Sequence, residues 1–241
     1  VDALQLVAAC FDDQLVGAVS SEDRFISQDG SVAGEGAYVR YEMWLRRLES
    51  DRAGLVGLSG SFFAARRSVC ADWDIASPSD FNTALNCARL GLVAVSSPKV
   101  IGEYSDIKDS AQEFARKVRT VIRGMTALSR HPEALNPMRV GQFAFQVWSH
   151  KVMRWGVPGC MLAFLILTLV LLDGGSVFRA IFALQVVFYS LAVAGWMSQR
   201  LRDFSIVRIV FFFVQTNLAL AQAAVLFLAG RRMTVWEPSK R

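Results

Sequence analysis

The chain has 241 residues, of which 53% are hydrophobic and 20% charged, and its formal net charge is +5. No lysine- and arginine-rich run is interleaved with aromatic residues, which argues against a nucleic-acid-binding protein. The four cysteines lie far apart and form no CxxC pair, which argues against a disulfide framework or a cysteine zinc site.

The charge is distributed unevenly along the chain. Nearly all of it lies before Trp155, and most of the remainder is apolar. This shift predicts two parts made for two different solvents. The chain opens, without an initiator methionine, on the amphipathic helical pattern VDALQLV (1–7), so we expect a fragment whose own beginning is missing.

Three short apolar runs before residue 110 predict β-strands. They cover 15–19, 62–65 and 92–95, and Pro98 is expected to end the last of them.

Helical periodicity lies between these runs. One helix is predicted over 38–48 and another over 80–89, with Ser77 or Ser79 as its cap and Gly91 as its stop. Strands that alternate with helices indicate an α/β layered structure.

Two segments ahead of the apolar region have one apolar and one basic side. They are SAQEFARKVRTVIRGMTALSR (110–130) and FAFQVWSHKVMRW (143–155). Both are predicted to be helices that lie in the membrane interface. A solvated surface helix is the alternative for either.

Three uncharged runs follow, over 155–172, 180–198 and 209–230. Each is close to the roughly 20 residues that a helix needs to cross the hydrocarbon core of a bilayer. Open sheet edges cannot lie in lipid, so strands are not expected there. Buried core helices are the alternative, and three runs in series disfavour it.

The basic residues that flank these runs predict an orientation. Lys151 and Arg154 precede the first run, and Arg200 and Arg202 follow the second, so residues 1–150 are expected on the cytoplasmic side. Three crossings would place the basic tail outside, against the same rule, and the side of the tail stays open.

The common catalytic signatures are absent from the sequence. It has no P-loop, GxGxxG or HExxH motif, and GLSGS (57–61) narrowly fails the nucleophile-elbow pattern. His131 and His150 have no carboxylate or cysteine cluster near them in the sequence. We therefore expect neither a hydrolase triad nor a metal site built from these residues.

The order of several short motifs resembles the second half of a family 2 glycosyltransferase, of the membrane-embedded cellulose, hyaluronan and poly-N-acetylglucosamine synthase type. The motifs, followed by SHKVMRW (149–155) and the three apolar runs, are VGAVSS (16–21), GEGAYVRYEMWLRRLES (34–50), GLSGSFFAARRSV (57–69), SPSDF (77–81) and RKVRTVIRG (116–124).

This resemblance implies a partial GT-A, Rossmann-like α/β domain over 1–112, on the acceptor side and without its donor-binding half. Amphipathic interface helices would follow over 113–156, about three transmembrane helices over 157–230, and a basic tail over 231–241. It also implies a cell inner (plasma) membrane protein with a cytoplasmic catalytic domain. Its partners would be a nucleotide sugar, usually a UDP-sugar, a polysaccharide or glycolipid acceptor, and the lipid bilayer.

The catalytic base of the family is the last Asp of a short acidic motif, and that position falls on Asp80. A carboxylate there would take the proton of the acceptor hydroxyl as its oxygen attacks the anomeric carbon. The alternative is a first-turn carboxylate that only complements the helix dipole.

The QxxRW motif of the family maps onto residues 116–120. Arg116 stands in place of the Gln and Thr120 in place of the Trp, while Arg119 keeps the arginine, whose guanidinium suits phosphate oxygens. Ser59 and Gly60 of the GLSGS motif are further candidates for binding donor or acceptor.

The family uses Mg²⁺ or Mn²⁺, and its DxD ligands are expected upstream of Val1. Asp12 and Asp13 follow the opening helix, where the family has a loop, so we do not assign them as metal ligands. We therefore expect this chain alone to be inactive.

A second class of function stays open beside the enzyme. It is a non-catalytic membrane partner subunit, derived from a degenerate glycosyltransferase, or a small transporter. Few charges lie inside the apolar runs, which argues against an ion or proton pathway.

Overall fold

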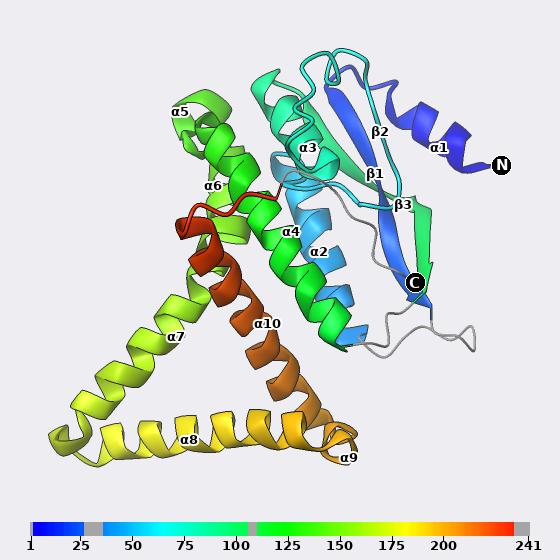
Figure 1. The fold of residues 1–241 in the computed structure, drawn as a ribbon. Helices are drawn as coiled ribbons and strands as arrows, with labels where there is room; N and C mark the ends of the chain where they lie inside the picture. The colour runs from blue at the N-terminus through cyan, green and yellow to red at the C-terminus, as the bar shows by residue number, and fades with distance from the viewer. Residues whose placement is uncertain (1, 27–35, 106–109, 234–241) are drawn as a thin grey trace. The chain divides into compact units, whose positions relative to one another are not determined.

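The computed structural model describes residues 2–26, 36–105 and 110–233 (Figure 1). Gly34 and Glu35 of the second motif, and residues 234–241 of the predicted tail, lie outside the described residues. The chain divides into two compact units. Unit 1 comprises 1–110, 123–152 and 232–241, and unit 2 comprises 111–122 and 153–231.

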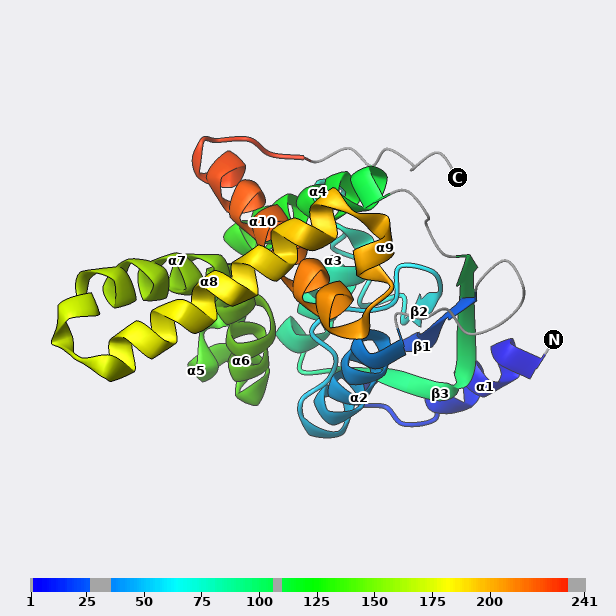
Figure 2. The ribbon, with the colours of Figure 1, turned by 90° about the horizontal axis from the view of Figure 1, so that it is seen from below.

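A three-stranded sheet forms the centre of unit 1. Its strands are β1 (Val16–Ile26), β2 (Phe63–Ala65) and β3 (Val93–Ser105), in the order β2-β1-β3 (Figure 2). β1 pairs antiparallel with β2 and parallel with β3. The three predicted strands are therefore confirmed as one small mixed sheet.

Helices cover both faces of this sheet. Helix α1 (Asp2–Cys10) places Val7 in a buried cluster with Val19 and Val100 on one face. Helix α3 (Ser79–Arg89) places Cys87 in a second buried cluster with Ala18 and Leu55. Apolar side chains alternate between the two faces of β1 because successive residues of a strand point to opposite sides. The expected α/β layers are thus present.

β3 continues through Pro98 to Ser105, so the expectation that Pro98 ends the strand is wrong. The pairing with β1 steps from Ser21↔Ser97 to Glu22↔Ile101, which leaves Pro98, Lys99 and Val100 in a bulge. Proline has no N–H to donate to a ladder, and a bulge is a place in a sheet that tolerates it.

The predicted cap of α3 is also wrong. The N-cap residue is Pro78, and no side chain caps the helix. The Ser77 hydroxyl instead donates to Asp74 Oδ2 at 2.7 Å. The predicted stop is confirmed: the helix ends at Arg89, and Gly91 follows with φ = 70°, a conformation that glycine adopts without strain.

The remaining helices of unit 1 pack around this α/β core. Helix α2 runs over Gly36–Arg52 and α4 over Ser110–Arg130, whose residues 111–122 belong to unit 2. After them come η1 (Pro132–Leu135), α5 (Pro137–Val140), α6 (Gln142–Val147) and the π-helical turn η2 (Trp148–Val152).

Unit 2 is helical. It contains α7 (Met153–Val170), η3 (Leu172–Gly174), α8 (Ser176–Met197), α9 (Gln199–Arg202) and α10 (Ser205–Leu228), together with residues 111–122 of α4.

Three helices among the described residues are long and apolar enough to cross a membrane, as predicted: Gln142–Val170, Ser176–Met197 and Ser205–Leu228. The segment 143–155 forms the start of the first of these helices, and its position in the membrane interface stays a prediction. The helix Gln142–Val170 contains the π-helical turn Trp148–Val152 and continues through Pro158.

The helices of unit 2 approach closely at small residues. A Cβ on Gly195 of α8 would stand 3.0 Å from Phe211 Cβ of α10, and glycine permits this approach. The Thr168 hydroxyl of α7 donates to Gln185 Oε1 of α8 at 2.9 Å.

Candidate active site

The irregular segment 55–61, between α2 and β2, connects the elements of the candidate site. It begins after Gly54, whose φ of 93° turns the chain so that Leu55 N–H can donate to Ala94 O of β3 at 2.7 Å. A Cβ on Gly54 would lie 3.0 Å from Ala94 N, so this residue has both a conformational and a steric reason to be glycine.

A buried polar cluster anchors the middle of the segment to β1. Ser59 N–H donates to Ser20 Oγ at 2.7 Å, and the Ser59 hydroxyl donates to Asp23 Oδ1. Ser61, which is exposed, also donates to Asp23 Oδ1, at 3.2 Å. Arg46 of α2 closes the cluster, with Nη2 2.7 Å from Ser20 Oγ and Nη1 3.4 Å from Asp23 Oδ2.

The same segment is tied to α2 through a carboxylate. Glu49 Oε2 accepts a hydrogen bond from Val56 N–H at 3.3 Å. Its Oε1 is hydrogen-bonded to Nδ1 of His150, whose Nε2 lies 3.2 Å from Glu42 Oε1. The expectation that His150 has no carboxylates around it is therefore wrong, because α2 brings in two from about 100 residues upstream.

His131 also has acidic neighbours, against the expectation. Nδ1 lies 3.2 Å from Glu133 Oε1, and Nε2 lies 3.8 Å from Asp74 Oδ2. Asp74 belongs to the loop before α3 and accepts a hydrogen bond from Arg130 Nε at 2.7 Å. This contact fastens the loop to the end of α4.

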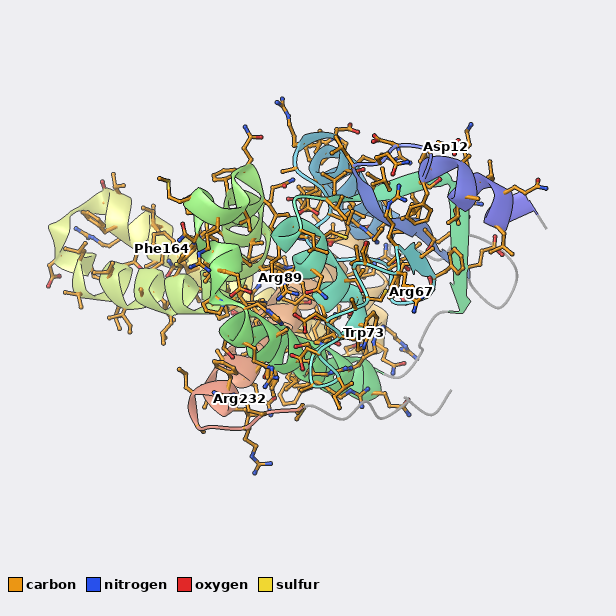
Figure 3. The ribbon with its side chains drawn as sticks, turned by 90° about the horizontal axis from the view of Figure 1, so that it is seen from above. Asp12, Arg67, Trp73, Arg89, Phe164 and Arg232 are labelled. Carbon is orange, nitrogen blue, oxygen red and sulfur yellow. The ribbon has the colours of Figure 1, made fainter. Side chains whose placement is uncertain are left out.

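Burial raises the pKa of Asp74, but the hydrogen bonds from Ser77, Arg130 and the Ala76 N–H outweigh it and lower the pKa to about 2. Two neighbours of Asp74 face outward. Trp73 is 39% exposed (Figure 3). Asp72 pairs with Arg89 at 2.6 Å.

Asp80 lies in the first turn of α3 and is partly exposed. Its backbone oxygen accepts a hydrogen bond from Leu58 N–H at 3.3 Å, which joins α3 to the 55–61 segment. Its Oδ1 accepts from Phe81 N–H at 2.9 Å. A carboxylate held by the backbone on a turn-to-helix junction can serve as a proton acceptor, and it also complements the helix dipole.

Lys151 of η2 lies against the same junction. Its Nζ is 5.6 Å from the ring centroid of Phe81. A Cβ on Gly57 would stand 3.5 Å from the same Nζ.

The predicted site residues fall into both units. Ser59, Gly60 and Asp80 belong to unit 1, where Ser59 and Asp80 are linked through Leu58 and Gly60 is exposed. Arg116, Arg119 and Thr120 belong to the part of α4 in unit 2, where both arginines are half-buried and Thr120 is exposed.

That part of α4 packs on α10. Lys117 pairs with Glu113 at 2.8 Å, donates to Thr216 Oγ1 at 3.3 Å and lies 4.2 Å from the ring centroid of Phe212.

Sequence reasoning missed Asp23, Glu42, Glu49 and Lys151. The last three lie inside motifs that carry the family resemblance, YEMWLRRLES and SHKVMRW, but nothing in one sequence says that these motifs meet.

Within the described ranges, no group of three or more His, Cys, Asp and Glu side chains could hold a metal ion. Asp12 lies where α1 ends (Figure 3), and Asp13 Oδ1 accepts a hydrogen bond from Leu15 N–H at 2.9 Å, as a turn residue does. The described residues therefore form no cation site. All four cysteines are free.

The fold is similar to that of a solved glycosyltransferase. The structure is similar to a mannosyltransferase from Pyrobaculum calidifontis, determined in complex with GDP-Man and Mn²⁺, with a TM-score of 0.63 and 19% sequence identity. The match covers 96% of this chain and 59% of that one. No protein-family model matches the sequence, and a search of curated proteins found no match. The chain therefore has a glycosyltransferase fold and spans about three-fifths of the length of this structural neighbour.

Proposed function

We propose that the chain is the acceptor-side part of a membrane-embedded, inverting family 2 glycosyltransferase. It would transfer a sugar from a nucleotide sugar to a polysaccharide or glycolipid acceptor at the cytoplasmic face of the inner membrane. The observation that carries the proposal is the fold shared with a mannosyltransferase over 96% of this chain. The position of Asp80 at the junction of α3 and the 55–61 segment supports a site there.

Asp80 acts as the general base in this proposal. Its carboxylate takes the proton of the acceptor hydroxyl while that oxygen forms a bond to the anomeric carbon. The bond from the anomeric carbon to the diphosphate breaks on the opposite side, and the nucleoside diphosphate leaves with the electron pair. The configuration of the sugar is inverted.

In this proposal the other candidate residues bind and orient the donor and the acceptor. Ser59 and the exposed Gly60 lie at the Asp23 cluster, where hydroxyl and carboxylate oxygens suit the hydroxyls of a sugar. Arg116 and Arg119 supply positive charge for phosphate or acceptor oxygens, and Thr120 lies next to them. The structural neighbour was determined with Mn²⁺, and a divalent cation is also expected for this protein, but no step is assigned to it.

The donor is a separate part of the proposal. The resemblance favours a UDP-sugar, whereas the structural neighbour holds GDP-Man. Incorporation of radiolabelled sugar should therefore be measured in membranes that contain the complete protein, with UDP-glucose, UDP-N-acetylglucosamine and GDP-mannose in parallel. One of these donors should give a lipid-linked or polymeric product.

The decisive variant is Asp80→Asn, which keeps the shape of the side chain but removes the proton acceptor. Transfer should fall by roughly 10²–10⁴-fold while binding of the nucleotide sugar changes little. Asp51→Asn, at an exposed carboxylate near the end of α2, is the matched control and should leave transfer unchanged. Near-normal transfer by Asp80→Asn would return Asp80 to a helix-dipole role. No transfer by the unmodified protein with any donor would favour the non-catalytic partner subunit.

A further inference from the structure

The π-helical turn η2 directs two successive side chains toward two different parts of unit 1. His150, whose side chain is 7% exposed, lies between Glu42 and Glu49 of α2. Lys151 reaches the ring of Phe81, the residue that follows Asp80. π-Helical turns inside longer helices are frequent at functional sites. This one links Glu42 and the buried Glu49 of α2 to the junction that carries the candidate base.

The imidazole lies between two carboxylates, one beside each of its nitrogens. Nε2 lies 3.2 Å from Glu42 Oε1, and Nδ1 is hydrogen-bonded to Glu49 Oε1. Only the imidazolium, with an N–H on each nitrogen, can satisfy both carboxylates at once. Since Glu49 also accepts from Val56 N–H, and its backbone oxygen accepts from Gln146 Nε2 at 3.1 Å, the ring cannot turn without breaking several contacts.

Fixing His150 fixes the rotation of the helical turn and therefore the direction of Lys151. The Lys151 ammonium is half-buried against a wall formed by Gly57 and Phe81. The backbone bond from Leu58 N–H to Asp80 O holds the two sides of this wall together. Because residue 57 is a glycine, no side chain from that position covers the ammonium.

An ammonium group in a partly desolvated position is suited to bind an anion. Its attraction for a charged oxygen is stronger there than in bulk water. Lysine binds phosphate as a compact point charge, with three donors that can follow the oxygen atoms. The rival reading is purely internal, since two carboxylates and one imidazolium leave a net charge of −1 that Lys151 offsets.

We propose that Lys151 binds a phosphate group of the substrate, and that Glu42, His150 and Glu49 form a positioning triad that aims it. The proposal rests on the proposed function for the identity of that substrate. The phosphate belongs either to the diphosphate of the donor or to a phosphorylated acceptor, and both sources present the same chemistry to the ammonium.

The first experiment compares Lys151→Met with Lys151→Arg and with Lys99→Met in the complete protein in detergent. Lys99 is exposed in the β3 bulge and serves as the matched control. The probes are UDP and GDP for the donor source and dodecyl phosphate for the acceptor source. Lys151→Met should weaken binding of at least one probe by roughly tenfold to a hundredfold, the usual effect of losing a charged hydrogen bond. Lys151→Arg should stay close to the unmodified protein.

The second experiment tests the triad. His150→Gln should weaken binding of the same probe, and the double variant with Lys151→Met should bind it no more weakly than Lys151→Met alone. Such non-additivity is the signature of residues that act through one another. Glu49→Gln repeats the test if His150→Gln does not fold, and the melting temperature of each variant is measured beside its affinity.

The outcomes separate the two proposals. Probe binding that depends on Lys151, in a protein that transfers no sugar, would uphold this inference and overturn the proposed function. Normal transfer and normal probe binding by Lys151→Met would overturn the inference alone and leave Lys151 as an internal counter-charge. Additive losses in the double variant would overturn the triad.

Discussion

Different interactions stabilise the 55–61 segment of unit 1 and the three long helices of unit 2. In the segment, polar side chains from β1 and α2 bond to backbone or hydroxyl groups 7 to 39 residues away, as Ser20 does to Ser59 and Glu49 does to Val56. In the helices, polar side chains bond to backbone carbonyl groups of their own helix. Asn217 Nδ2 donates to Phe213 O, four residues back in its own helix, and the Thr168 hydroxyl lies within reach of Phe164 O in its own helix as well as of Gln185 Oε1 in α8.

This difference follows from the surroundings of each region. A helix in an apolar environment satisfies its backbone internally, so its neighbours contribute mainly shape, as with Gly195 and Phe211. The irregular 55–61 segment has no ladder of its own and must take its partners from elsewhere in the fold. A substitution in the segment should therefore disturb several elements, whereas one in the helices should disturb one contact.

The largest effect, a loss of nucleotide binding, is expected from a substitution of Arg119, a basic residue in the mainly apolar unit 2. Arg119→Ala should weaken binding of UDP or of the donor by roughly tenfold to a hundredfold and leave membrane insertion intact, because it removes a charged contact to phosphate. Equilibrium binding to the complete protein measures it, with Arg139→Ala at an exposed arginine of α5 as control. Unchanged affinity and turnover would leave the basic side of α4 as a packing or lipid-facing surface.

Gly102→Ala should damage the Asp23 cluster from the side of β3. Its Cβ would lie 2.5 Å from Ser61 Oγ and 3.0 Å from Ser21 Oγ, and Ser21 is buried. Overpacking of this kind costs about 1–3 kcal/mol of unfolding free energy. Thermal unfolding measures the loss, and adding Ser61→Ala should recover part of it because the nearest atom is removed. Failure of that rescue would mean that the cluster does not hold the segment.

Gly195→Leu should act only within the helices. The leucine would push α8 away from Phe211 and Val207 of α10, at a cost of about 1–2 kcal/mol. Unfolding in detergent measures it, and Gly159→Leu, where a Cβ meets nothing within 4 Å, should be near neutral. Equal effects of the two changes would contradict close packing at Gly195.

The smallest effect is expected at Asp74 and depends on pH. Its pKa is lowered from 3.8 to about 2 in the folded protein, so its contribution is complete above pH 4 and disappears as the pH falls toward 2. Asp74→Asn should therefore cost up to about 1 kcal/mol near neutral pH, because Arg130 is half exposed, and nothing at pH 2. Thermal unfolding at pH 6 and at low pH checks the difference. A cost that does not change with pH would contradict the ion pair.

Much of the fold could be predicted from local patterns. The runs at 15–19, 62–65 and 92–95 are strands because short apolar segments bounded by polar residues suit a sheet. The helical periods around 38–48, 80–89 and 110–130 are helices for the same local reason. The errors at Pro98 and at the α3 cap arose where a partner element, β1 in one case and Asp74 in the other, changed what a residue does.

The sequence by itself determined the change from a charged to an apolar composition, the three long apolar helices and the α/β pattern, because hydropathy and periodicity act over a few neighbouring residues. Only the tertiary structure decided the surroundings of the candidate site. It placed Glu42 and Glu49 on His150, and it placed Lys151 on the junction of Gly57 and Phe81. Contacts between residues 70 to 108 positions apart leave no trace in local spacing, because they depend on how α2, α3 and η2 pack around one segment.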